Sequence, residues 1–270
     1  MTCRGINQNF IGIRMNQSKF TVRQLFEAGV HFGHRRNLWN PKMSQYIYGV
    51  RNNMHIVNLK DTYYMLNVAL DVLKSVAAKN GKILFVGTKR QATEVVAENA
   101  QKCGQHYVNY RWPGGMLTNW HTVSRSLKTL EEFEKQLADK DSLLTKKERL
   151  NLTKKKERLE KMLGGIRNMN GLPDLIFVID TNEQRIAIEE ANKLNIPVIA
   201  VVDTNASLEG VTYVIPGNDD ASKAIELYMN LAQESVLEGI QQSLIKAGVD
   251  IGAAEKALIE DSANFNAKKE

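Results

Sequence analysis

Short apolar runs that alternate with helix-like segments constrain the fold of this 270-residue chain more than any other feature. The runs at residues 82–86, 175–179, 197–202 and 213–215 are almost free of polar side chains and are too short for buried helices. Strands that are apolar along their whole length are typical of a parallel sheet covered by helices on both faces. Helix-like segments follow three of these runs. The pattern therefore predicts an α/β fold, a doubly wound and mainly parallel sheet with helices on both faces.

The segment that precedes the first of these runs has local signals of its own. Thr21 and Gln24 have the spacing of a capping box, which begins a short helix that Gly29 ends. Residues 46–50 and 55–58 are typical of two strands joined by a turn.

Residues 120–166 interrupt the alternation of strands and helices. Apolar residues recur there at spacings of three, four and seven, among many Lys, Arg and Glu side chains. This pattern predicts an inserted antiparallel helical hairpin of the coiled-coil type. The alternative is two surface helices that lie on the sheet. We favour a projecting hairpin, because its second half has little apolar surface for docking and carries Lys146, Lys147, Lys154, Lys155, Lys156, Arg158 and Lys161.

The remaining organisation follows from these elements. The globular α/β domain is expected at residues 21–119 and 167–238, between an N-terminal extension at 1–20 and an acidic, mobile tail at 239–270. The extension is basic without an apolar signal-peptide core, so it is a plain extension or an organelle presequence. The two cysteines lie a hundred positions apart, which indicates a reducing compartment. No apolar stretch approaches the roughly 18 residues of a membrane span.

Charge is distributed unevenly along the chain. Residues 1–60 hold nine Lys or Arg and one acid, and residues 61–170 hold twenty basic and twelve acidic residues. Residues 171–270 hold seven basic and seventeen acidic residues. The net charge of +6 therefore combines a basic front with an acidic last third. Such polarity bears on partners rather than on fold, and a basic front favours a polyanion such as nucleic acid.

Two loops, at residues 31–42 and 111–120, interleave basic, aromatic and glycine residues. Cations neutralise phosphates, and aromatic faces stack on unpaired bases, so this composition favours RNA. The alternative for the tryptophans is packing in the core. We expect RNA contacts from these loops, from nearby strand ends and from the hairpin, through His31, His34, Arg35, Arg36, Trp39, Lys42, Arg51, Lys89, Arg90, Arg111, Trp112, Lys146, Lys147 and Lys154.

An enzyme on the same scaffold is the alternative function. Ligands of doubly wound sheets bind at the carboxyl ends of the strands. Carboxylates placed there could bind magnesium beside a phosphorylated small molecule held at residues 87–90, or they are helix caps and turn residues. The chain has no dinucleotide fingerprint, P-loop or nucleophile elbow, so we favour a protein that is not an enzyme. The carboxylates in question are Asp180, Asp203, Asp219 and Asp220.

His31 and His34 are spaced like two ligands of a metal ion. No cysteine lies nearby, and the sequence places no third ligand beside them. We therefore expect no metal, and interpret the pair as loop residues that hydrogen-bond the backbone or contact RNA.

Several motifs taken together resemble one known family. The first is His31-Phe-Gly-His34 followed by Trp39-Asn-Pro-Lys-Met43. The others follow in order, between about residues 18 and 240: NMHIVNL (53–59), GKILFVGTKR (81–90), GGMLTN (114–119), LTKKE (144–148), LGGI (163–166), LPD (172–174), VDTN (202–205) and IPGNDD (215–220). On these residues the chain resembles the ribosomal protein S2 family of the small ribosomal subunit, in its bacterial form.

The resemblance implies an αβα domain with a coiled-coil insertion. It also implies binding to small-subunit rRNA near the junction of head and body, next to other small-subunit proteins. In bacteria these would include the largest small-subunit protein. Catalysis, a cofactor, a small-molecule substrate and a membrane are not expected. The implied location is the ribosome of the bacterial cytoplasm, or alternatively of the mitochondrial matrix. A third hypothesis is a protein-interaction module that docks through the hairpin.

Overall fold

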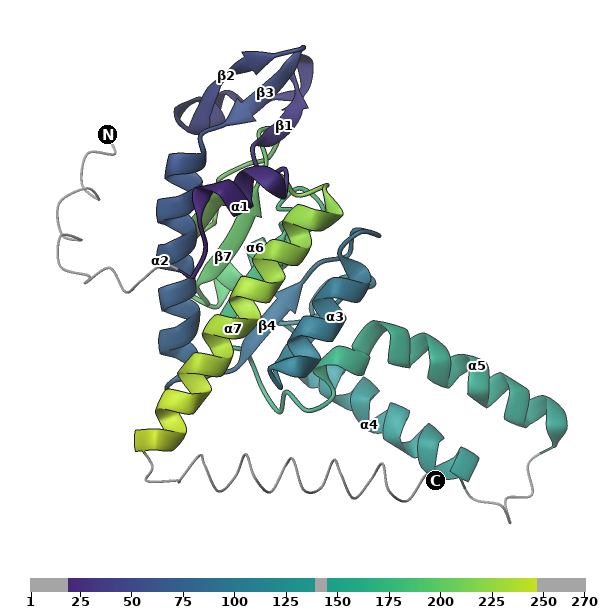
Figure 1. Cartoon of the computed structure of the whole chain (residues 1–270). Coiled ribbons are helices and arrows are strands. Elements are labelled where there is room, and N and C mark those ends of the chain that lie inside the picture. Colours follow the sequence, from purple (N-terminus) through teal and green to yellow (C-terminus); the bar gives the residue numbers. More distant parts are fainter. Residues whose placement is uncertain (1–18, 139–144, 247–270) are drawn as a thin grey trace, which may run out of the picture.

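The computed structural model describes residues 19–138 and 145–246. They form a layered α/β domain, a small antiparallel sheet and a helical hairpin (Figure 1). The predictions for the N-terminal extension before Lys19, for the connection within the hairpin and for the tail after Lys246 lie outside these residues.

A five-stranded parallel sheet forms the centre of the molecule. Its strands are β4 (Ile83–Val86), β5 (His106–Val108), β6 (Leu175–Ile179), β7 (Val198–Val202) and β8 (Tyr213–Pro216). The order across the sheet is β5-β4-β6-β7-β8, so the chain builds outward first on one side of β4 and then on the other. Every neighbouring pair is parallel, which confirms the doubly wound fold class.

The predicted strands agree with the observed ones to within one residue. The apolar runs correspond to β4, β6, β7 and β8. The sequence does not predict β5, because a three-residue edge strand that begins with His106 shows neither a long apolar run nor an alternation.

Helices cover both faces of the sheet. One face packs against α2 (Leu59–Ala77), α3 (Thr93–Lys102) and α7 (Ser222–Lys246). The other face packs against α6 (Arg185–Lys193) and the loop that follows β5. Successive strand residues alternate between the two cores, as the pleat requires: Phe85 lies in the first and Leu84 in the second. Helix α7 continues to Lys246, past the expected end of the globular domain at residue 238.

The short helix at the start of the described chain confirms its sequence signal. Helix α1 (Val22–Glu27) begins at a capping box in which Thr21 and Gln24 bond each other's backbone. Gly29, with a φ of 77°, follows its end. Phe20, just before it, is buried and packs against Tyr63. Among the described residues, no helix is both long and apolar enough to cross a membrane.

The small sheet comprises β1 (Phe32–Arg35), β2 (Ile47–Arg51) and β3 (Met54–Val57), in the order β1-β3-β2. The predicted strand pair is confirmed as β2 and β3. Asn52 and Asn53 join them with φ angles of 50° and 63°, which asparagine tolerates better than most residues. Residues 32–35 are predicted as part of a loop but form β1, because their pairing with the more distant β3 leaves no local signal.

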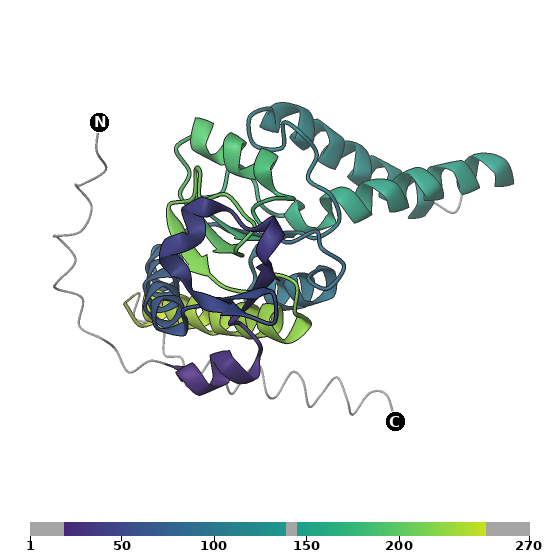
Figure 2. The same cartoon turned by 90° about the horizontal axis from the view of Figure 1, so that it is seen from above.

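The small sheet is anchored on the carboxyl edge of the main sheet (Figure 2). Thr204, directly after β7, accepts a hydrogen bond from the His34 backbone at 2.8 Å through its hydroxyl and one from the Asn40 backbone at 2.8 Å through its carbonyl. A Cβ on Gly33 would lie 2.6 Å from the Thr204 side chain. Glycine is therefore needed in the His31–His34 motif for close approach between the two sheets.

The predicted helical hairpin is present as α4 (Trp120–Ala138) and α5 (Lys146–Leu163), followed by the short turn η3 (Gly164–Ile166). Only its base enters the second core, through residues such as Leu127 and Leu163. The outer part projects from the body, as Figures 1 and 2 show. The projecting arrangement that we favoured therefore holds over the surface-helix alternative.

Candidate nucleic-acid interface

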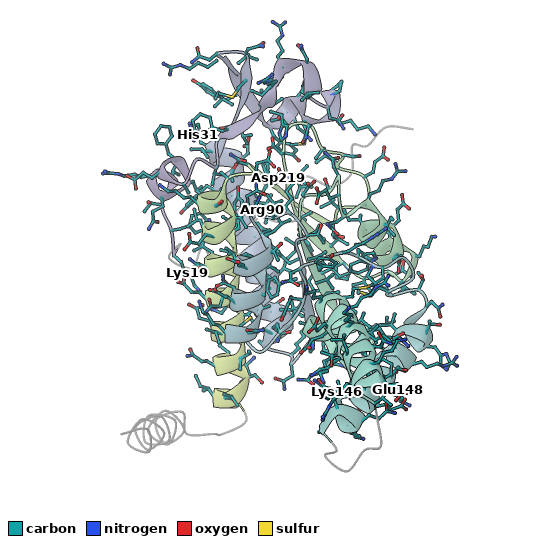
Figure 3. All side chains as sticks on the ribbon, turned by 90° about the vertical axis from the view of Figure 1, so that its right-hand side faces the viewer. Lys19, His31, Arg90, Lys146, Glu148 and Asp219 are labelled. Carbon is teal, nitrogen blue, oxygen red and sulfur yellow. The ribbon has the colours of Figure 1, made fainter. Side chains whose placement is uncertain are left out.

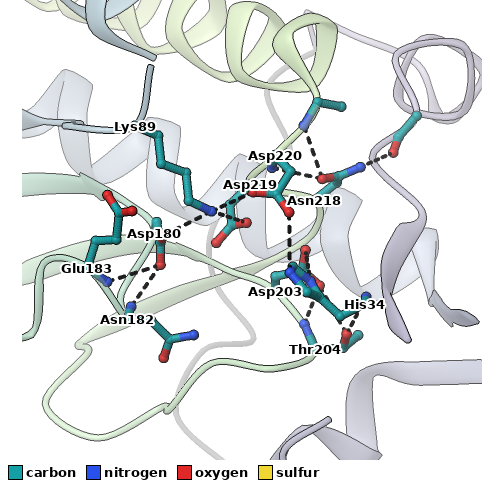
Figure 4. Close-up of polar contacts among 12 residues, drawn as sticks. His34, Lys89, Asp180, Asn182, Glu183, Asp203, Thr204, Asn218, Asp219 and Asp220 are labelled. Carbon is teal, nitrogen blue, oxygen red and sulfur yellow. Dashed lines mark hydrogen bonds and ion pairs between the residues drawn. The ribbon is translucent and has the colours of Figure 1, made fainter. Parts of the chain in front are cut away.

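The carboxyl ends of four parallel strands meet at one ion-pair network (Figure 4). Lys89, after β4, lies with its Nζ 2.9 Å from Asp180, 2.8 Å from Asp219 and 2.7 Å from Asp220. These carboxylates follow β6 and β8. Asp180 and Asp219 are buried, and the Lys89 side chain is only 15% exposed. A lysine of the chain itself thus occupies the crevice where doubly wound proteins hold a ligand.

The charges of this network shift the pKa values of its members. Burial disfavours the charged form of Lys89, but its contacts with Asp219, Asp220 and Asp180 outweigh burial and raise the pKa of its ammonium. Burial and the nearby carboxylates of Asp203 and Asp180 raise the pKa of Asp219 to about 7, against the opposing effect of Lys89. The network is therefore short of positive charge rather than in excess of it.

His34 extends the network toward the small sheet. Its Nδ1 lies 3.0 Å from Asp203, and its Nε2 lies 3.2 Å from Asp220. The hydrogen bond with Asp203 raises the pKa of this histidine, and burial only partly opposes it. His34, Asp203 and Asp220 each offer a ligand atom within 4.8 Å of the others, a donor set that could hold a divalent metal. The histidine pair of the sequence is not this set, because His31 lies apart from it.

Other groups at this edge act as turn caps, as the simpler interpretation of the aspartates expects. One Asp180 oxygen accepts hydrogen bonds from the backbones of Asn182 and Glu183 at 2.8 and 3.4 Å. The side chain of Asn218 likewise accepts from the Asp220 and Ala221 backbones ahead of α7. Asp180 therefore serves the fold twice, as a turn cap and as a partner of Lys89.

The exposed predicted residues lie mainly on the small sheet and beside it. Arg35, Arg36 and Arg51 are exposed, and none of their guanidinium groups has a carboxylate partner in the described part of the chain. Arg90 is exposed close to the Lys89 network, as Figure 3 shows by its position near Asp219. Lys42 is exposed but forms an ion pair with Glu209. Exposed aromatic and apolar side chains surround these cations: Phe32, Leu38, Trp39, Tyr48 and Val50.

Four predicted RNA contacts are buried or half-buried with their side chains engaged within the protein, and His34, which bonds Asp203 and Asp220, is one of them. His31 is buried and stacks on Phe26, with ring centroids 4.4 Å apart. Lys89 is held by its three aspartates. Trp112 is buried in the second core, the alternative that the sequence left open. Trp39 has an intermediate position, because it lies against His55 at 5.1 Å but remains 36% exposed.

A buried glutamate holds the loop that contains Arg111 and Trp112. Glu190, on α6, accepts hydrogen bonds from the backbones of Gly115 at 2.7 Å and Leu117 at 2.9 Å and from the indole of Trp112 at 3.2 Å. Thr118 adds two more. Burial alone would raise the pKa of Glu190, but these donors outweigh it and lower the pKa below its ordinary value. No sequence pattern distinguishes this glutamate from its exposed neighbour Glu189.

Replacing Glu190 with glutamine is expected to reduce the free energy of unfolding near pH 7 by about 2 kcal/mol, because the amide group meets N–H donors without a carboxylate charge. Since the pKa of Glu190 is lowered in the folded state, the stability that its carboxylate contributes is fully present above about pH 4.5. This stability is lost as the pH falls through the folded-state pKa. The difference in free energy of unfolding between the native chain and Glu190→Gln, measured by urea unfolding, should therefore be smaller near pH 3 than near pH 7.

The matched control is Glu189→Gln, since Glu189 is exposed and, among the residues that the structure describes, pairs only with Arg185 on the same helix. Its effect should stay below about 0.5 kcal/mol at both pH values. Equal effects of the two substitutions would contradict the role assigned to Glu190.

The hairpin brings the other predicted cations together in two places. Lys146 and Lys147 are exposed in the first turn of α5, at the far end of the hairpin (Figure 3). Lys154 lies closer to the body, in a pocket that it shares with Arg111. Lys154 and Arg111 belong to separate predicted elements, and they come together because the base of the hairpin packs against the loop after β5.

Comparison with known proteins agrees with this architecture. The family model for ribosomal protein S2 matches residues 25–239. The small ribosomal subunit protein uS2 of Rhodospirillum centenum is 56% identical over 239 residues, which cover 88% of this chain and 92% of the relative. The proteins of the same name from Granulibacter bethesdensis and Wolbachia pipientis wMel are 54% and 57% identical, over 91% and 87% of this chain and 95% and 84% of their own lengths. The chain belongs to the ribosomal protein S2 family.

Proposed function

We propose that the protein is a structural constituent of the small ribosomal subunit that binds rRNA through the small sheet and the hairpin. As a member of the ribosomal protein S2 family it is a ribosomal protein and not an enzyme. The main support for RNA binding is that Arg35, Arg36 and Arg51 are exposed together at one end of the molecule. None of the three has a carboxylate partner among the described residues. The aspartates at the adjoining carboxyl edge of the main sheet are already engaged by Lys89 and His34.

The proposed contact set follows the exposure of the side chains. It comprises cations of the small sheet and its neighbour Arg90, together with Arg111 and the hairpin lysines. Cations on mobile exposed side chains neutralise phosphates, and the exposed aromatic side chains among them offer stacking surfaces for unpaired bases. His31, Lys89 and Trp112 support this surface from inside rather than contacting RNA.

The family resemblance supports a finer placement. On this resemblance we propose that the protein lies near the junction of the head and body of the subunit, next to other small-subunit proteins, including the largest one in bacteria. The similar proteins of Rhodospirillum centenum, Granulibacter bethesdensis and Wolbachia pipientis wMel are bacterial, which supports the ribosome of the bacterial cytoplasm over that of the mitochondrial matrix.

Binding of the purified chain to small-subunit rRNA should weaken steeply with salt. Each phosphate neutralised contributes roughly −0.7 to −0.9 to the slope of log affinity against log salt concentration, so five contacts predict a slope near −4. Filter binding over a series of salt concentrations measures it. A flat salt dependence, or a complex with small-subunit proteins that survives complete RNase digestion, would count against RNA binding and favour a protein-interaction module.

A further inference from the structure

An open pocket lies where the loop after β5 meets the inner half of α5. Its volume is about 650 Å³. The loop contributes Tyr110, Arg111 and Trp112, and α5 contributes Lys154, Arg158 and Lys161. We call it the hairpin pocket. It is distinct from the small sheet, because its walls are the loop after β5 and helix α5, which pack on the face of the main sheet that α6 covers.

The lining of the hairpin pocket suits a ligand that is an anion with an aromatic part. Its four cations have no ion-pair partner within residues 19–138 and 145–246. Tyr110 is 60% exposed, although its ring carries a large apolar area that proteins usually bury. Pro113 and Met162 add apolar wall. A phosphate alone needs the cations but not the ring, whereas an aromatic ligand alone needs no cations.

The pocket is preorganised, so a ligand does not have to order its loop. Glu190 holds the backbone of Gly115, Leu117 and Thr118 and the indole of Trp112 from behind. On the hairpin side, a Cβ on Gly165 would meet the Tyr107 carbonyl oxygen at 2.1 Å, so the base of the hairpin is packed tightly on β5. Tyr110 is thereby presented between two fixed walls.

We propose that the hairpin pocket takes one unpaired nucleotide of RNA, with its base stacked on Tyr110 and its flanking phosphates on the pocket cations. This proposal rests on the proposed function and names a subsite of it. A duplex cannot insert a base into a side pocket without unpairing it, so the ligand is a bulged or single-stranded nucleotide. Glu157, also in the wall, repels an acidic peptide but accepts hydrogen bonds from the amino groups of bases.

The test measures fluorescence anisotropy of labelled RNA with the full chain. The probes are a hexamer of adenylate, whose bases carry amino groups, and a 12-base-pair RNA duplex. Tyr110→Ala should weaken hexamer binding about tenfold and leave its salt slope unchanged, since stacking is lost and no phosphate contact is removed. Binding of the duplex should be the same for the native chain and the variant.

Charge and stacking are separated by a second variant. Arg111→Gln with Lys161→Gln should reduce the steepness of the hexamer salt slope by about 0.7 for each cation lost. Tyr64→Ala is the matched aromatic control, because Tyr64 is 51% exposed on α2, on the opposite face of the sheet. It should leave hexamer binding unchanged.

The outcomes separate this proposal from the function on which it rests. Equal hexamer affinity for Tyr110→Ala and the native chain overturns the hairpin pocket, even if intact rRNA still binds with a steep salt slope. Binding of hexaglutamate as tightly as the hexamer also overturns it. Failure of the native chain to bind rRNA overturns the proposed function instead. Whether hexamer binding depends on Tyr110 still decides whether the hairpin pocket binds a nucleotide.

Discussion

Lys89→Met lowers the free energy of unfolding by about 4 kcal/mol, the largest effect that we expect from any single substitution in this protein. The substitution keeps the volume of the side chain but removes the only cation that contacts both Asp180 and Asp219 within the described residues. Both carboxylates are buried, and Asp203 adds a third negative charge nearby. Removing one member of a buried pair leaves an uncompensated charge in a poorly solvated site. Urea unfolding near pH 7 measures the loss.

Two further variants make the Lys89 prediction specific. Arg90→Met removes a neighbouring cation that is exposed, and should change stability by less than about 0.5 kcal/mol. Adding Asp219→Asn to Lys89→Met should restore part of the stability, because it removes the charge left unpaired. An Asp219 variant that fails to restore any stability, together with a small effect of Lys89→Met, would show that the network contributes little.

Charge reversal on the small sheet has the largest expected effect on function. Arg35→Glu combined with Arg36→Glu should weaken binding to small-subunit rRNA on the order of 100-fold near physiological salt, because two phosphate contacts are lost and replaced by repulsion. The salt slope should become less steep by about 1.4 to 1.8. In cells, a tagged copy of the variant should be depleted from small subunits separated by sedimentation.

The control for this prediction carries the same change in charge on the opposite edge of the main sheet. Lys79→Glu with Lys193→Glu alters exposed cations beyond the end of α2 and at the end of α6, far from the small sheet. It should sediment with small subunits like the native chain. Equal depletion of both double variants would indicate a general effect of net charge, and unchanged incorporation of the arginine variant would exclude this part of the small sheet as an RNA contact.

The sequence could predict the main sheet because its strands are apolar on both faces, so the signal is local and strong. The apolar run at Leu175–Ile179 coincides with β6 at both ends for this reason. The elements that escaped prediction have non-local causes. Strand β1 exists through its pairing with β3, and β5 is a short edge strand beside β4.

The candidate site was predictable by position more than by role. The order of strands and turns placed Lys89 and the four aspartates at one edge, which is where they lie. Whether Lys89 faces RNA or the carboxylates of Asp180, Asp219 and Asp220 depends on how side chains point in the separate loops that follow β4, β6 and β8. The spacing of residues along the chain does not encode these directions. Glu190 was missed because a charged residue on an amphipathic helix is usually solvated, and only the loop folded over it makes it buried.

The lysine-filled crevice has a consequence for how the protein behaves before assembly. Because the position of a ligand is occupied by the chain's own ammonium group, the core is complete without any other molecule. The part of the chain that the structure describes can therefore keep its shape while it awaits a subunit, unlike ribosomal segments that fold only on RNA. Association of residues 19–138 and 145–246 should behave as docking of an already folded domain, with a modest heat-capacity change and little ordering entropy lost outside their surface side chains.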